Sequence, residues 1–138
     1  MTSEQPRPLA AGEPRRDTRA VLRCSRTDVL VVTRLRVAGN MLSRLKGLLG
    51  SAEPAPGDGL WIVPCSGVHT VGMRYPIDVV FLDRAGRIVA TRPELRPLRA
   101  VPWVRHAHSA LELRQGAIAR CDLRTGDVLV VDPGGTAG

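Results

Sequence analysis

Short apolar runs separated by turn-forming residues, about ten residues apart, most constrain what this chain can fold into. Runs that are rich in β-branched residues and bounded by Gly, Pro or Asp are typical of strands. No long helical pattern separates them, so a parallel βαβ sheet is not expected. The pattern predicts a mainly β fold, either a single compact β-sandwich or a partly closed β-barrel. The clearest predicted strands are the stretches DVLVVTRLRVA, LWIVP, IDVVFL, RIVATR, ALELR and VLVV.

One short amphipathic helix interrupts the strand pattern. In the stretch NMLSRLKGLLG, apolar residues recur at helical spacing between a plausible N-cap at Asn40 and a terminating Gly50. Upstream, residues 1–27 are rich in Pro and Arg and lack periodicity, which predicts a disordered arm. We therefore expect a single β domain over 28–132, followed by a frayed tail over 133–138.

Length, cysteine count and charge narrow the class of protein. A chain of 138 residues can bury one core without disulfides, and three cysteines without a C-x-x-C spacing favour a reducing compartment. The N-terminus lacks the apolar centre of a secretory signal and no run reaches the ~20 residues of a membrane span, so a cytoplasmic protein is expected. The net charge of +7 invites nucleic-acid binding, but four aromatic residues are too few for a base-stacking surface, so nucleic-acid binding is not expected.

The segment PCSGVHTVGMRYPIDVVFLD, residues 64–83, concentrates the residues that could carry chemistry. A thiol enzyme would need Cys65 and His69 within hydrogen-bond reach, yet four extended residues span ~13 Å. The two can meet only if Ser66 and Gly67 form a turn. A metal site could add His106 and His108, but this pair is flanked by arginine, so neither a metal nor another cofactor is expected.

A structural interpretation of the same segment is an ion pair. Arg74 lies at a bend and could fold back onto Asp78 or onto Glu112, which alternates with leucines and so points to the opposite face from them. A bidentate arginine–carboxylate pair is strong and fixes orientation. His69 could join it by donating a ring N–H. This hypothesis predicts that Arg74 is needed for stability.

Several stretches together resemble the bacterial and archaeal domain of unknown function family 192. They are RLKGLLG, GLWIVPC, VHTVGMRYPIDVVFLDRAGRIV, ALELRQG and GDVLVV, in this order, and the resemblance covers residues 28–132. It implies a small, mostly β single domain and supplies no activity. Some members resemble exported proteins.

The remaining interpretation is a binding site. His69, Thr70 and Arg74 would suit a small anion or a peptide carboxylate, and Trp61 and Trp103 could line an apolar wall. Trp103 could equally anchor a partner protein or cap the core. With no complete catalytic constellation, we expect a non-enzymatic binding or adaptor module; the alternative is an enzyme or metal protein that uses Cys65 and His69. The predicted pocket residues are Cys65, His69, Thr70, Arg74, Asp78, Trp61 and Trp103.

Overall fold

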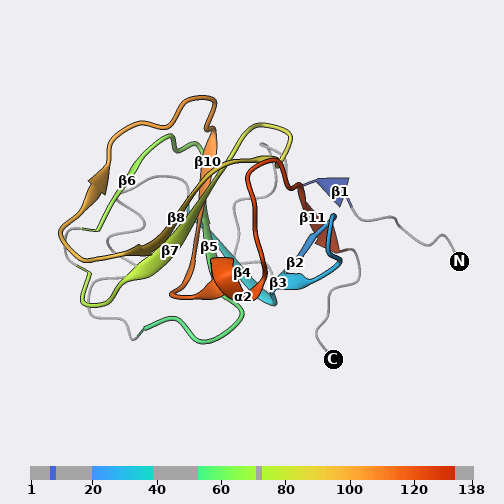
Figure 1. Cartoon of the computed structure of the whole chain (residues 1–138), viewed down its shortest axis with the longest axis horizontal. Coiled ribbons are helices and arrows are strands. Elements are labelled where there is room, and N and C mark those ends of the chain that lie inside the picture. The colour runs from blue at the N-terminus through green and yellow to red at the C-terminus, as the bar shows by residue number, and fades with distance from the viewer. Residues whose placement is uncertain (1–6, 9–19, 39–52, 71–72, 133–138) are drawn as a thin grey trace, which may run out of the picture.

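The computed structural model describes residues 7–8, 20–38, 53–70 and 73–132, and within them the chain is mainly β (Figure 1). A five-stranded sheet has the order β4–β5–β10–β7–β8, formed by Arg34–Ala38, Asp58–Ile62, Ser109–Arg114, Ile77–Leu82 and Ile88–Leu95. A four-stranded sheet has the order β1–β11–β2–β3, formed by Arg7–Pro8, Leu129–Asp132, Val21–Cys24 and Leu30–Val32. A small pair joins β6, Val68–His69, to β9, Ala100–Val101.

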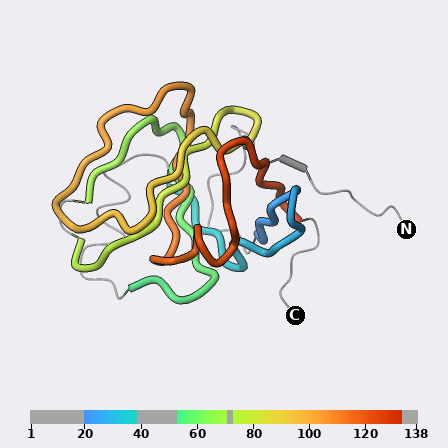
Figure 2. Tube along the Cα trace, in the orientation of Figure 1, coloured from blue at the N-terminus to red at the C-terminus, as the bar shows by residue number. Residues whose placement is uncertain are grey.

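The predicted mainly β fold is confirmed as a sandwich-like arrangement of separate sheets, not a closed barrel. The five-stranded sheet lies at the centre, and the four-stranded sheet occupies the right of Figures 1 and 2. The β6–β9 pair lies at the opposite end, on the left. Every residue of β7 is buried because both faces of the central sheet are covered.

Alternation along the strands divides the buried residues into two clusters. Leu111 and Leu113 of β10 face the first cluster. This cluster contains Trp61 of the central sheet together with Leu22 and other residues of the four-stranded sheet. Ala110 faces the second cluster on the other side of the central sheet. The second cluster also contains Ile62, Cys65, Val68, Ile77, Val79, Phe81 and Val104.

Two features of the fold differ from the sequence-based prediction. The strand β2 falls inside the predicted arm, and its Leu22 and Cys24 are fully buried, so the folded part begins before residue 28. The strands β4 and β5 pair in parallel, because residues 39–57 give a connection long enough for a crossover. The described residues also contain a short helix, α2, Ala117–Arg120, between β10 and β11.

Some predictions lie outside the described residues. They are the amphipathic helix between Asn40 and Gly50, most of the arm and the tail over 133–138. In the part of the chain that is described, no helix is long and apolar enough to cross a membrane.

Candidate interaction site

Two segments that are distant in sequence lie side by side at the β6–β9 end of the molecule. We call residues 64–70 the anchor segment and residues 96–106 the Arg–Trp loop. They run antiparallel, green beside orange on the left of Figures 1 and 2. Backbone hydrogen bonds join them: Val104 N–H donates to Ser66 O at 2.8 Å and Thr70 N–H to Arg99 O at 2.8 Å. Just beyond the loop, Cys65 N–H donates to His108 O at 2.7 Å. The loop is therefore fixed to the fold rather than being an independent excursion.

Thr70 is the polar centre of this contact. Its side chain is fully buried, and Oγ1 accepts the Arg99 N–H at 2.8 Å while it donates to Arg96 O at 2.6 Å. The Thr70 carbonyl accepts N–H groups from Met73 at 3.1 Å and from Leu98 at 3.3 Å. One residue thus satisfies backbone groups on both sides, and its hydroxyl is occupied by the protein itself.

Gly67 allows the two segments to approach closely. A Cβ atom at this position would lie 2.6 Å from Val101 O and in contact with Pro102 O, closer than real Cβ atoms come to backbone oxygen. Val104 on the loop is buried in the second cluster, where the partly buried Val101 and Ala107 also pack. The inner face of the Arg–Trp loop therefore has the packing of a core.

The outer face of the loop is different. Leu98 is 74% exposed and Trp103 is 67% exposed, and Arg96, Arg99 and Arg105 are also exposed. Leu98 and His106 have positive φ values of 63° and 67°, a conformation that costs side chains of this kind about 1 kcal/mol or more. The loop thus holds large apolar groups in water on a constrained backbone.

The two tryptophans have opposite environments. Trp61 is 1% exposed and belongs to the first cluster, so its placement gives no support to the predicted role in a pocket wall. Trp103 is 67% exposed, so it does not cap the core. The alternative, that it anchors a partner protein, stays a hypothesis.

Asp78 is not arranged as the ion-pair hypothesis predicts. It is fully buried, and its two oxygens accept backbone N–H groups, Oδ1 from Glu94 at 2.9 Å and Oδ2 from Ile118 at 2.8 Å. Arg74 is exposed, and among the described residues it forms no ion pair with Asp78 or with Glu112. The carboxylate therefore joins β7 to the end of β8 and to α2, using amides where a guanidinium was expected.

Glu112 follows the alternation that its sequence predicts. It is 5% exposed, stands opposite Leu60 of β5 and Val79 of β7, and its neighbours Leu111 and Leu113 face the first cluster. A strand places its side chain on the other face, with the second cluster.

The remaining candidates for chemistry have structural contacts. The Cys65 thiol donates to Gly67 O at 2.8 Å, so its sulfur is directed at the backbone of its own segment. His69 pairs with Ala100 in the β6–β9 ladder. The His108 backbone N–H donates to Leu82 O at 2.8 Å, and His106 is exposed. Within the described ranges, no three His, Cys, Asp or Glu side chains are grouped closely enough to hold a metal ion.

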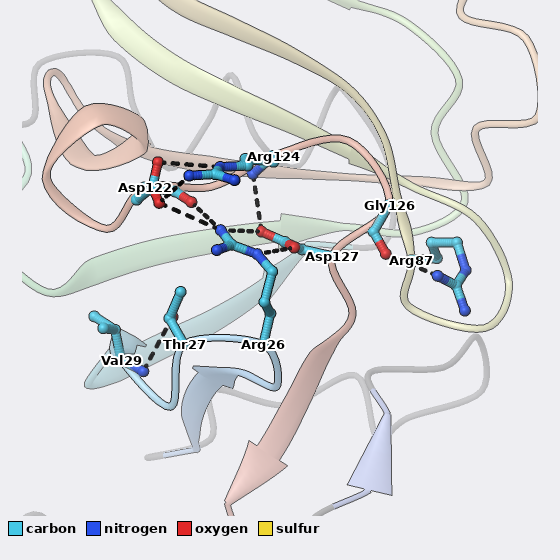
Figure 3. Close-up of polar contacts among 8 residues, drawn as sticks. All are labelled: Arg26, Thr27, Val29, Arg87, Asp122, Arg124, Gly126 and Asp127. Carbon is cyan, nitrogen blue, oxygen red and sulfur yellow. Dashed lines mark hydrogen bonds and ion pairs between the residues drawn. The ribbon is translucent and has the colours of Figure 1, made fainter.

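A polar cluster that sequence analysis missed joins the turn after β2 to the turn before β11 (Figure 3). Arg26 Nε donates to Asp127 Oδ1 at 2.7 Å, and Asp127 Oδ2 also accepts the Arg124 N–H at 2.9 Å. The hydrogen bond from Arg26 lowers the pKa of Asp127, against burial, which acts in the opposite direction. Asp127 is 6% exposed, so the cluster is a clamp between two turns at one end of the four-stranded sheet rather than an open site.

Two solved structures resemble the fold. A crystal structure from Sinorhizobium meliloti 1021, of a protein named as a candidate transcription regulator, has a TM-score of 0.71 and 20% identity, covering 87% of this chain and 98% of that one. A protein of unknown function from Novosphingobium aromaticivorans DSM 12444 has a TM-score of 0.69 and 16% identity, covering 92% of this chain and 93% of that one. At these identities the likeness shows the fold alone.

Family membership rests on a separate comparison. No curated protein matches the chain significantly. The family model DUF192, described as Uncharacterized ACR, matches residues 22–131, which include β2, the anchor segment and the Arg–Trp loop. The match begins at β2, in agreement with the start of the folded part. The resemblance inferred from the sequence motifs is confirmed, and the chain belongs to the DUF192 family.

Proposed function

We propose that this protein is a non-enzymatic binding module whose contact surface is the Arg–Trp loop and whose partner is another protein. The observation that carries the proposal is Trp103, which is 67% exposed on a backbone that is hydrogen-bonded to the anchor segment. Tryptophans on preorganised surfaces are frequent anchors of protein interfaces, where truncation costs about 2 kcal/mol or more.

The rigidity of the loop supports this function. Association is weakened by the entropy lost when loops and side chains are ordered, and a loop that is already held avoids part of that loss. Thr70, Gly67 and Val104 hold the Arg–Trp loop from beneath, and Pro97 and Pro102 restrict its backbone. The positive φ values of Leu98 and His106 are unfavourable for folding, and backbone strain of this kind is typical of segments that bind a partner.

The residues of the predicted pocket have a different part in this proposal. Cys65, Thr70 and Asp78 direct hydrogen-bonding groups to the protein's own backbone, which leaves them unsuited as the first contacts of a ligand. We assign Cys65 and Thr70 to the anchor segment that supports the loop, and Asp78 to the connection of β7 with β8 and α2. A thiol enzyme gains no support from a Cys65 proton that is donated to a carbonyl.

The test is a selection from a random peptide library displayed on phage, using the full chain as bait, followed by titration of synthetic versions of the enriched peptides. We expect Trp103→Ala to weaken binding by about thirtyfold, the equivalent of about 2 kcal/mol. The matched control is Leu30→Ala, which removes an apolar side chain that is 44% exposed on β3, in the other sheet. Peptides that bind the Trp103→Ala variant as tightly as the wild type, or no enrichment above an unrelated bait, would overturn the proposal.

A further inference from the structure

Positive charge is concentrated in the segments around the Arg–Trp loop. Residues 64–77 and 95–111, which lie together through the β6–β9 pair, contain four arginines and all three histidines of the protein, with no Asp or Glu. In the other described residues between 20 and 132, ten arginines are balanced by ten acidic residues. The excess positive charge of the described residues between 20 and 132 is therefore concentrated in residues 64–77 and 95–111, which we call the charged end. The four arginines are Arg74, Arg96, Arg99 and Arg105.

Four arginines elsewhere in the described residues, Arg23, Arg26, Arg34 and Arg124, form ion pairs with acidic side chains. Arg23 lies 2.9 Å from Asp132, and Arg26 lies 2.7 Å from Asp127. The four arginines of the charged end are exposed, and in the described part of the chain no acidic side chain forms an ion pair with any of them. Arg96, Arg99 and Arg105 belong to the same loop as the exposed Leu98 and Trp103.

Building on the proposed function, we infer that the partner presents an acidic segment in which carboxylates flank an apolar side chain. Arginine binds carboxylate in a planar, bidentate geometry, and charges at the rim of an interface accelerate association and exclude wrong partners. Trp103 and Leu98 supply the apolar contact within the arginine set.

The shape of the surface favours a protein over other anionic partners. A single-stranded nucleic acid needs several aromatic side chains on which successive bases stack, and Trp103 is the one aromatic side chain classed as exposed in the described residues. A membrane surface is usually bound by an amphipathic helix whose apolar face enters the lipid. Here the apolar groups are two side chains on a loop with arginines between and beside them, a pattern that matches a peptide with alternating apolar and acidic residues.

The peptides enriched in the selection provide the probes. We expect them to carry Asp or Glu next to an apolar residue. Versions with Asp→Asn and Glu→Gln changes should bind about tenfold more weakly at low salt, and this difference should shrink at high salt. The double variant Arg99→Gln, Arg105→Gln should lose most of the preference for the acidic version. The matched control, Arg84→Gln with Arg120→Gln, removes two exposed arginines outside the charged end and should keep that preference.

Each other outcome has a defined meaning. Enriched peptides without acidic residues, or neutralised versions that bind equally well while still requiring Trp103, overturn the inference and leave the proposed function standing. Binding that does not require Trp103 overturns both. A third outcome is that vesicles containing phosphatidylserine, or single-stranded DNA, compete at lower concentrations than the acidic peptide. If this competition is lost in the Arg99→Gln, Arg105→Gln variant, it overturns the inference in favour of that partner.

Discussion

Replacing Asp78 by Asn separates the arrangement in the structure from the ion pair that the sequence suggests. Both oxygens of the buried Asp78 accept a backbone N–H, from Glu94 at 2.9 Å and from Ile118 at 2.8 Å. Asparagine has one carbonyl oxygen, so its NH2 group must face one of these two amides, donor against donor. The substitution keeps the shape of the side chain while it removes the charge and one acceptor.

The expected loss follows from the contacts. A hydrogen bond to a charged group contributes about 1.5–3 kcal/mol, and here one bond is lost and the other becomes neutral. We therefore expect the free energy of unfolding to fall by about 2–4 kcal/mol, with a decrease in Tm of roughly 10 °C. Because domains of this size are stable by about 5–15 kcal/mol, the variant should still fold at room temperature.

The assay is urea unfolding followed by circular dichroism, together with amide exchange at Glu94 and Ile118. The control Asp83→Asn alters a carboxylate that also accepts two backbone N–H groups, from Ala85 at 2.9 Å and Arg87 at 3.0 Å, but in a surface turn. Both groups donate to the same oxygen, Oδ1, and asparagine retains one carbonyl oxygen that can accept both, so that change should cost less than about 1 kcal/mol.

Arg74→Ala provides the opposing test. The exposed Arg74 should contribute less than about 0.5 kcal/mol to stability. If Arg74→Ala and Asp78→Asn destabilise equally, and the double variant loses no more than either single one, the two side chains are coupled and our account of Asp78 is refuted. A loss below about 0.5 kcal/mol for Asp78→Asn would refute it as well.

Three further predictions concern the Arg26–Asp127 clamp and the support of the loop. Because Arg26 lowers the pKa of Asp127 from its ordinary value of 3.8, this carboxylate stabilises the wild type fully above about pH 5, and the contribution is lost as pH falls through 3.8 and then through the lower folded pKa. The stability gap to Asp127→Asn should therefore narrow only below about pH 4; a gap in urea unfolding that stays constant down to about pH 2 would contradict this. Gly67→Ala should destabilise by about 1–3 kcal/mol, because its Cβ would press on Val101 O; an unchanged Tm would show that the segments can separate freely. Thr70→Val keeps the shape but removes the hydroxyl, so about 1–2 kcal/mol should be lost and amide exchange in the Arg–Trp loop should accelerate; exchange at the wild-type rate would show that the hydroxyl does not hold the loop.

The strands of the central sheet could be predicted from the sequence because their residues have the pattern that is typical of buried strands. Ile77–Leu82 and Ser109–Arg114 are short runs bounded by turn residues, and both are strands in the structure. The strand at Val21–Cys24 was missed because its four residues stand among arginines, and its burial depends on pairing with β11, more than a hundred residues later in the chain. A local pattern does not contain that partner.

The contacts of the signature segment were harder to predict for a related reason. Charge complementarity suggested a guanidinium for Asp78, but its partners are the amides of Glu94 and Ile118, which any residue type could supply. The same holds for Thr70, whose partners are the backbone groups of Arg96 and Arg99. Sequence identifies the polar side chain that needs a partner, whereas only the fold shows which backbone groups come close to it.

These contacts give the binding proposal a kinetic consequence. Thr70 and Gly67 do not face solvent as Trp103 does, so changes at these two residues act on the partner only through the conformation of the Arg–Trp loop. A loosened loop must be ordered at each encounter, so affinity falls even though every contacting side chain is still present. Loss of an apolar contact raises the dissociation rate, whereas loss of a rim arginine mainly lowers the association rate and its salt dependence. Rate measurements can therefore distinguish an anchor such as Trp103 from a steering residue such as Arg99.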